Sequence, residues 1–115
     1  PGIFSISSTK VSGPVPGFII YITVMKSYHV YILFSAADKM MYTGITSNLP
    51  RRIRQHNQGQ CKSTRNRRPL YLIYHETSYN IRDAAAREKY LKSGYGKKYI
   101  RNRLKYQLSG IFTTG

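Results

Sequence analysis

The sequence is poor in cysteine and in long apolar segments, and each shortage excludes a class of protein. The single cysteine, Cys61, permits no intramolecular disulfide and no zinc site built from cysteines. One free thiol is typical of a reducing compartment, so we expect a cytoplasmic location. No segment reaches the roughly 18 consecutive apolar residues of a membrane-spanning helix. The 115 residues provide for one hydrophobic core, which predicts a single domain.

Acidic residues are also scarce. Four stand against nineteen Lys and Arg, so the formal net charge is +15 and the isoelectric point is about 10.3. Such an excess is typical of proteins that bind nucleic acid or an anionic membrane surface. The basic residues are spread over expected helices and loops, and no basic helix carries a continuous apolar face suited to lying on lipid. We therefore expect a nucleic-acid partner and no membrane.

Residues 1–24 differ in composition from the rest of the chain, because they are rich in Ser, Thr, Gly and Pro and contain one basic residue. A signal peptide would need basic residues ahead of a longer apolar core. We expect an N-terminal extension outside the core, either an expression remnant or a segment upstream of a start at Met25. A β-strand added at Phe18–Val24 is the alternative. Residues 25–115 then form the folded domain.

Three segments rich in β-branched and aromatic residues predict strands, at residues 28–34, 40–45 and 70–75, of which the last is expected to be largely buried. A turn at residues 36–39 would make the first two a hairpin. The basic segment at residues 60–69, which has no apolar run, is expected to be a loop.

Helix signals stand between and after these strands. Asn48 and Asn80 can cap helices, and Pro50 is tolerated in a first turn. Gly94 and Gly96 interrupt the apolar pattern before it resumes over residues 97–106. The order ββαβαα predicts an α+β fold, a small three-stranded antiparallel sheet packed with about three helices.

Glu88 is the acidic residue without an ordinary explanation. The other three lie in a turn, at a strand end and in a first helical turn, whereas Glu88 shares a predicted helix face with Ala84, Ala85 and Leu91. A carboxylate on an apolar face would be desolvated unless it met a cation, and near a bound phosphate a hard divalent metal is a suitable partner. The alternative is an exposed Glu88 paired with Lys92 at i+4.

Two further pairs have the chemistry that phosphodiester cleavage requires. Arg52 and His56 are spaced i, i+4 on one expected helix, so a guanidinium and an imidazole can meet one phosphate. Tyr31 and Tyr42 lie on paired strands and can point at one spot if they share a sheet face. Taken alone, Arg52 and His56 could also be solvated or backbone-binding side chains. Taken alone, Tyr31 and Tyr42 could also be packing residues.

Together these residues resemble a known pattern. Val30-Tyr31-Ile32 and Tyr42-Thr43-Gly44, followed by Arg52, His56 and Glu88 in order, are similar to the GIY-YIG nuclease superfamily, and the resemblance runs from about Tyr28 to Leu104. It is closest to small bacterial members related to the N-terminal incision domain of the excision-repair nuclease. His29 and Val30 stand where the first motif has Gly and Ile, and Thr43 replaces an Ile, but both tyrosines and Gly44 are kept.

The resemblance implies a metal-dependent DNA endonuclease that acts in repair or recombination. It implies that Glu88 holds one Mg²⁺ or Mn²⁺ ion, that Arg52 steadies the scissile phosphate, that a tyrosine, Tyr31 or Tyr42, activates or positions the water, and that His56 assists proton transfer. DNA would be recognised by backbone or shape more than by base sequence. We expect the following cations to bind it: Arg51, Arg54, Lys62, Arg65, Arg67, Arg68 and Lys92.

Two alternatives stay open on sequence alone. A non-catalytic nucleic-acid-binding module with the same fold would share the basic surface, but it would have no need of Glu88. An RNA-binding protein would fit the charge equally well and predicts exposed aromatic residues on a sheet surface.

Overall fold

The computed structural model describes residues 25–112, so the segment Phe18–Val24 lies outside the described residues. The elements follow in the order β1 (Tyr28–Ser35), β2 (Met41–Thr46), α3 (Leu49–Asn57), the 3₁₀ helix η1 (Arg65–Arg67), β3 (Leu70–Ser78), α4 (Ile81–Lys92), α5 (Gly94–Arg103) and α6 (Lys105–Phe112). The strands form one antiparallel sheet in the order β2-β1-β3. The predicted α+β fold is confirmed, with one helix more than expected within this range.

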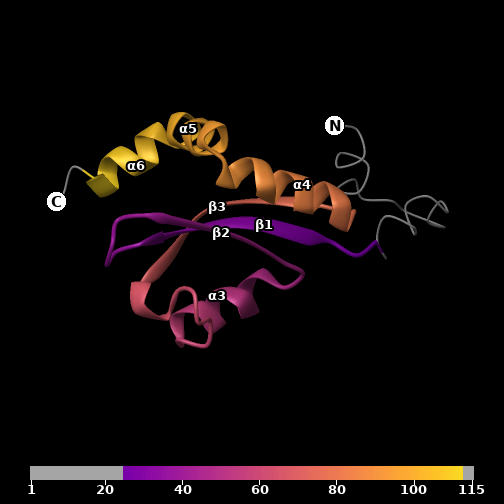
Figure 1. Ribbon diagram of the computed structural model, residues 1–115, viewed down its shortest axis with the longest axis horizontal. Helices are drawn as coiled ribbons and strands as arrows, with labels where there is room; N and C mark the ends of the chain where they lie inside the picture. The colour runs from indigo at the N-terminus through magenta and orange to yellow at the C-terminus, as the bar shows by residue number, and fades with distance from the viewer. Residues whose placement is uncertain (1–24, 113–115) are drawn as a thin grey trace, which may run out of the picture.

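The sheet is the middle of three layers, with α3 on one face and α4, α5 and α6 on the other (Figure 1). Because side chains alternate along a strand, β1 supplies both cores. Val30, Ile32 and Phe34 pack with the α4–α6 layer, whereas Tyr31 and Leu33 pack toward α3. The central strand is therefore buried from Val30 to Ser35, which explains its almost continuous apolar sequence there.

The expectation of a largely buried third strand is wrong. β3 lies at an edge of the sheet, and its side chains alternate irregularly between buried and exposed, with Tyr71 and Leu72 56% and 36% exposed. A register shift opposite Ile32 and Leu33 interrupts the pairing with β1. The apolar composition of β3 could not reveal this, because composition does not say which strand is central.

Local capping signals account for the helix boundaries. The Asn48 side chain accepts a hydrogen bond from the Arg51 amide at the start of α3, and Pro50 lies in the first turn. Asn80 accepts one from the Arg82 amide at the start of α4. Gly59, with φ of 77°, follows the end of α3 in a conformation that favours glycine.

The C-terminal helices differ from the expectation in two ways. The interruption expected at Gly94 and Gly96 occurs at Ser93, between α4 and α5. Both glycines lie in the first turn of α5, where the Ser93 side chain accepts a hydrogen bond from the Gly96 amide. In addition, α6 follows α5 after a break at Leu104. Ile100, Leu104 and Leu108 keep an i, i+4 spacing across this break, so the apolar period gave no sign of it.

Gly96 allows α4 and α5 to approach each other closely. A Cβ atom at this position would lie 2.1 Å from the Tyr90 carbonyl oxygen and 2.5 Å from the Leu91 Cα, whereas one at Gly94 would meet nothing within 4 Å. We expect Gly96→Ala to lower the free energy of unfolding by roughly 1–3 kcal/mol or more, through overpacking. Gly94→Ala, the matched control on the same helix, should leave it unchanged or slightly higher. Urea denaturation measures both, and equal stabilities would contradict the close approach.

Candidate active site

The two motif tyrosines lie on the same face of the sheet. Tyr31 pairs with Gly44 across β1 and β2, and Tyr42 pairs with Leu33, which places both tyrosines on the side of α3. Their ring centroids are 6.4 Å apart. The condition set from the sequence, that both tyrosines share a face, is met.

Helix α3 carries Arg52 and His56 to these tyrosines. The Tyr31 hydroxyl lies 2.8 Å from His56 Nε2 and accepts a hydrogen bond of 3.4 Å from Arg52 Nε. The Tyr42 ring meets the His56 ring edge to face, with centroids 5.1 Å apart. Four of the five residues predicted for the site therefore converge between β1, β2 and α3.

Gly44 makes room for the Tyr31 hydroxyl. A Cβ atom at Gly44 would lie 2.5 Å from this oxygen, closer than real contacts allow. Since Gly44 is directly opposite Tyr31 in the sheet, only a residue without a side chain lets the phenol reach Arg52 and His56. The motif glycine is thus needed for this close approach.

Thr64 is a member of this cluster that sequence reasoning missed. Its hydroxyl lies 2.7 Å from His56 Nδ1, and both side chains are fully buried. Thr64 belongs to the basic loop before β3, and no local pattern in that loop points to it.

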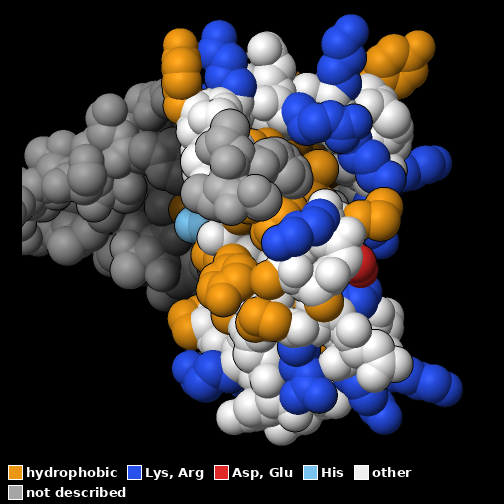
Figure 2. All heavy atoms as spheres, turned by 90° about the vertical axis from the view of Figure 1, so that its left-hand side faces the viewer, with side chains coloured by type: hydrophobic (Ala, Val, Ile, Leu, Met, Phe, Trp, Pro, Cys, Tyr) orange, Lys and Arg blue, Asp and Glu red, His pale blue; other side chains and the backbone are white. Residues whose placement is uncertain are grey.

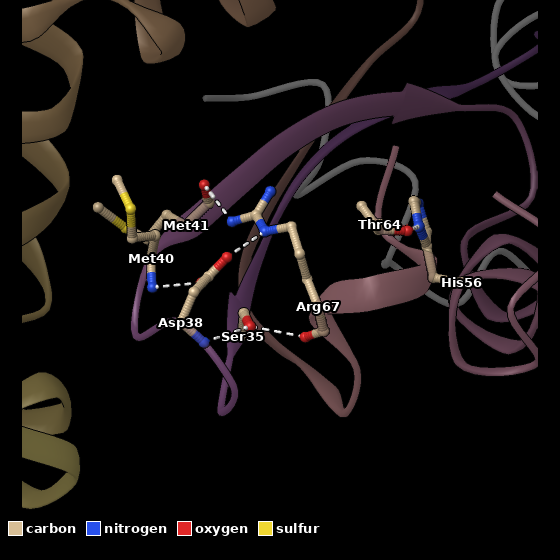
Figure 3. A network of polar contacts seen from close by, with 7 residues as sticks. All are labelled: Ser35, Asp38, Met40, Met41, His56, Thr64 and Arg67. Carbon is tan, nitrogen blue, oxygen red and sulfur yellow. Dashed lines mark hydrogen bonds and ion pairs between the residues drawn. The ribbon is translucent and has the colours of Figure 1, made fainter. Parts of the chain in front are cut away.

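The loop that carries Thr64 is tied to the β1–β2 turn, as Figure 3 shows. Arg67 Nε donates to Asp38 Oδ2 at 2.6 Å, and Arg67 Nη2 donates to the Met41 carbonyl at 3.3 Å. Ser35 Oγ in turn donates to the Arg67 carbonyl at 2.6 Å. These contacts fix the loop over the sheet and so hold Thr64 against His56.

Burial sets the protonation states of the cluster. It raises the pKa of Tyr31 to about 12 and lowers the pKa of His56 to about 4, the latter with help from the nearby Arg52 charge. At neutral pH the phenol is therefore protonated and the imidazole is neutral. Arg52 donates a hydrogen bond to the phenol oxygen, so the phenol hydroxyl donates its own hydrogen bond to His56 Nε2. The neutral imidazole then carries its proton on Nδ1 and donates it in a hydrogen bond to the Thr64 hydroxyl.

The residues differ in their access to solvent. Tyr31 and His56 are both fully buried, whereas Tyr42 and Arg52 are partly exposed. Arg52 lines a polar cavity of about 310 Å³ with Arg51, Gln55 and the end of β2. Arg52 and His56 thus do not meet a phosphate side by side, because only Arg52 reaches the surface.

Glu88 lies on α4, the helix that covers the opposite face of the sheet. The predicted helix face is only partly correct, because Ala84 and Leu91 are buried but Ala85 is exposed. The Glu88 side chain is 23% exposed and forms an ion pair of 3.3 Å with Lys92, the alternative considered from the sequence. One turn further along, Leu91 and Lys92 line a cavity with Tyr42 and Thr43 of β2. Glu88 is thus on a helix that packs against the strand carrying Tyr42.

A metal ion at Glu88 would depend on few protein ligands. Within residues 25–112, no three His, Cys, Asp or Glu residues gather around one point. A single carboxylate does not suit Zn²⁺, which takes several protein ligands. It does fit Mg²⁺, which retains several waters and often binds through one or two carboxylates and substrate phosphates.

Comparison with known proteins shows the family to which this chain belongs. The family model for the GIY-YIG catalytic domain matches residues 27–104, which include all five predicted site residues. The chain belongs to the GIY-YIG family. The GIY-YIG domain is that of a nuclease superfamily, which implies a nucleic-acid substrate.

Several curated relatives in the GIY-YIG family are UPF0213 proteins. One from Clostridium perfringens is 48% identical over 65 residues, which cover 56% of this chain and 69% of that protein. One from Pediococcus acidilactici is 41% identical over 81 residues, covering 65% and 82% respectively. One from Autographa californica nuclear polyhedrosis virus is 45% identical over 80 residues, covering 69% and 76%.

The predicted backbone-binding cations surround the GIY-YIG cluster unevenly. Arg67 is half-buried in its ion pair with Asp38, and Lys92 is exposed but pairs with Glu88. The others are exposed on α3 and the following loop: Arg51, Arg54, Lys62, Arg65 and Arg68. Their contact with nucleic acid stays a prediction. No helix of the part described is long and apolar enough to cross a membrane.

The buried His56 predicts a pH dependence of stability. Its pKa is about 4 in the folded protein and 6.5 in the unfolded chain, so below pH 6.5 the unfolded state binds a proton that the folded state does not. The contribution of neutral His56 to the free energy of unfolding is fully present above pH 6.5. It is lost as the pH falls toward 4, by up to roughly 3 kcal/mol.

Urea denaturation between pH 4.5 and 7.5 measures this loss. His56→Gln, which cannot titrate, should show a smaller decrease in the free energy of unfolding than the unsubstituted chain over the same range. An identical pH dependence of the two proteins would contradict the burial of a neutral imidazole.

Proposed function

We propose that this GIY-YIG protein is a metal-dependent endonuclease that hydrolyses phosphodiester bonds in DNA and acts in DNA repair or recombination. The observation that carries the proposal is the convergence of Tyr31, Arg52 and His56, in which a buried tyrosine fixes an arginine that lines a polar cavity. A preorganised cation of this kind stabilises negative charge as it develops on phosphorus oxygens.

Arg52 is the group proposed to bind the scissile phosphate. Its Nε donates to Tyr31 and its Nη1 donates to Gln55 Oε1 at 3.2 Å, so within the described residues Nη2 is left for a phosphate oxygen. A guanidinium held by two bonds loses little side-chain freedom when it binds its ligand. Tyr31 is therefore a positioning residue for Arg52, since its own hydroxyl is buried.

His56 and Tyr42 complete the proposed site, His56 from the protein interior and Tyr42 from the surface. His56 is buried and accepts a hydrogen bond from the Tyr31 hydroxyl, so it also acts as a positioning residue. The Arg52 charge is one of the causes that lower the His56 pKa, and a bound phosphate would offset it and make His56 a better proton acceptor. Tyr42, which is partly exposed, is the tyrosine proposed to contact the attacking water.

Glu88 is the proposed ligand for one Mg²⁺ or Mn²⁺ ion, which when bound would supply a Lewis acid for the phosphate. Within residues 25–112, β2 is an edge strand with no further strand outside it, and the Arg52 cavity lies on one of its faces and the α4 side of the sheet on the other. A DNA strand that lies across the β2 edge could approach both. Lys92 would release its ion pair with Glu88 when the metal binds, and it would then be available for a phosphate.

The proposed role of Glu88 predicts a loss of cutting without a loss of binding. Glu88→Gln keeps the shape of the side chain but removes the charge that holds the metal. We expect metal-dependent nicking of supercoiled plasmid to fall below detection, while DNA affinity changes less than about twofold. Asp83→Asn, an exposed carboxylate on the same helix, is the matched control and should cut normally. Full activity of Glu88→Gln would remove it from the site.

Binding without cutting by the unsubstituted chain, on plasmid and on branched duplexes with Mg²⁺ or Mn²⁺, would favour the non-catalytic nucleic-acid-binding module instead.

Arg52 should affect turnover more than affinity, because many cations share the binding but one faces the scissile phosphate. We expect Arg52→Ala to lower kcat by about 10²–10³-fold with a small change in KM. Arg54→Ala, an exposed arginine on the same helix, should change kcat less than about threefold and act on KM. Single-turnover cleavage of a labelled oligonucleotide separates the two effects, and equal kcat values for both variants would contradict the role of Arg52.

A further inference from the structure

A groove on the α4–α6 side of the molecule extends beyond the residues of the proposed cleavage site. Two cavities form it, of about 170 and 150 Å³, and Met41 and Lys97 line both, so the cavities are contiguous. The first begins at Tyr42 and Thr43 of β2, and the second ends at Lys39 and Met40 of the β1–β2 turn. The groove therefore leads away from the motif tyrosine toward one end of the molecule.

The walls of the groove combine an apolar floor with a basic rim. The accessible part of the floor is formed by Met41, which is partly exposed, and by Met40, which is 59% exposed at the mouth. The other apolar residues that line the groove are buried: Ile32, Leu91, Ile100 and Leu108. The side chains at the rim are all basic and exposed: Lys39, Lys92, Lys97 and Arg101.

Figure 2 looks onto the end of the molecule where the β1–β2 turn faces α5 and α6. Lys and Arg gather over the upper part of this face, where α5 and α6 lie, and again over the lower part, where α3 lies. Apolar side chains are exposed between the two groups, and acidic colour is almost absent from the view.

We propose that this groove holds a single-stranded segment of the nucleic acid, with bases on the apolar floor and phosphates on the basic rim. The inference rests on the proposed nucleic-acid substrate and narrows it to DNA that carries a single-stranded segment next to the cut, as at a branch or flap. Two linked small cavities suit successive units of a polymer.

The chemistry of the lining favours a single strand over a duplex. A duplex presents phosphates outward and keeps its base faces stacked inside, so it would use the basic rim but not the apolar floor. In a single strand the bases are free to stack on apolar and aromatic side chains while the phosphates meet cations.

Helix α5 offers a matched pair of variants for the test. Lys97 and Arg101, spaced i, i+4, line the groove, whereas Lys98 and Arg103 are exposed on the same helix and do not line it. Lys97→Gln with Arg101→Gln removes two charges from the rim. Lys98→Gln with Arg103→Gln removes the same two residue types and the same charge from elsewhere on the helix.

The experiment measures binding of a labelled single-stranded oligonucleotide by fluorescence anisotropy over a range of salt concentrations, with chelator present so that nothing is cut. We expect the groove pair to weaken binding about tenfold and to reduce the slope of log K against log[salt] by about 1.4, or about 0.7 for each lost phosphate contact. The control pair should lower affinity much less. Binding to a blunt duplex of the same sequence should differ little between the two pairs.

Three outcomes would overturn the proposal that the groove binds a single strand. The groove variant could bind the single strand as tightly as the unsubstituted chain, or the groove and control variants could lose affinity equally. The groove variant could also lose more affinity for the duplex than for the single strand. Because the binding is measured without cleavage, such a failure would leave metal-dependent cutting untouched. Conversely, an absence of cutting would not alter the comparison of affinities.

A second measurement needs no variant. In the unsubstituted chain, a bound single-stranded oligonucleotide should protect Lys97 from an amine-reactive reagent and leave Lys98 reactive, as mass spectrometry of the peptides would show. Equal protection of the two lysines would contradict the groove.

Discussion

The ring of His56 has no exposed surface, so both of its nitrogens must find partners inside the protein. One partner is Tyr31 of the central strand and the other is Thr64 of the loop before β3. The imidazole on α3 therefore joins a strand, a helix and a loop at one point. The position of Arg52, which is bound to the same tyrosine, depends on this junction, and so does any chemistry at the cavity that Arg52 lines.

A shortage of carboxylates shapes the rest of the molecule. Within residues 25–112, Asp38, Glu76 and Glu88 each pair with one cation, and the pair of Glu76 with Arg87 is reinforced by the Tyr74 hydroxyl. Two of these pairs have a structural use, because Asp38 anchors the basic loop through Arg67 and Glu76 joins β3 to α4. The third couples Glu88 to Lys92, and the proposed metal ion would compete with Lys92 for this carboxylate. Most of the remaining cations lie on the surface and are available to a polyanion.

The parts of this structure that depend on neighbouring residues were predictable from the sequence, and the parts that depend on distant contacts were not. Asn80 caps α4 as expected because a cap is local chemistry. The spacing of Ile100 and Leu104 fitted one continuous helix, although the chain breaks there. Thr64 carries no local signal, since only the folded loop brings it to the imidazole. Tyr71 is exposed because β3 is an edge strand, which its composition could not reveal.

The basic surface has a consequence for the lifetime of the protein. Folding brings many cations together, and their repulsion weakens the compact state. A polyanion that binds only the folded chain adds about 2.7 kcal/mol to its stability when present at 100 times its dissociation constant. Molecules that leave nucleic acid are then the least stable fraction of the population and the first to meet cellular proteases. A change in the amount of bound polyanion would thus change the stability of the folded chain through charge alone.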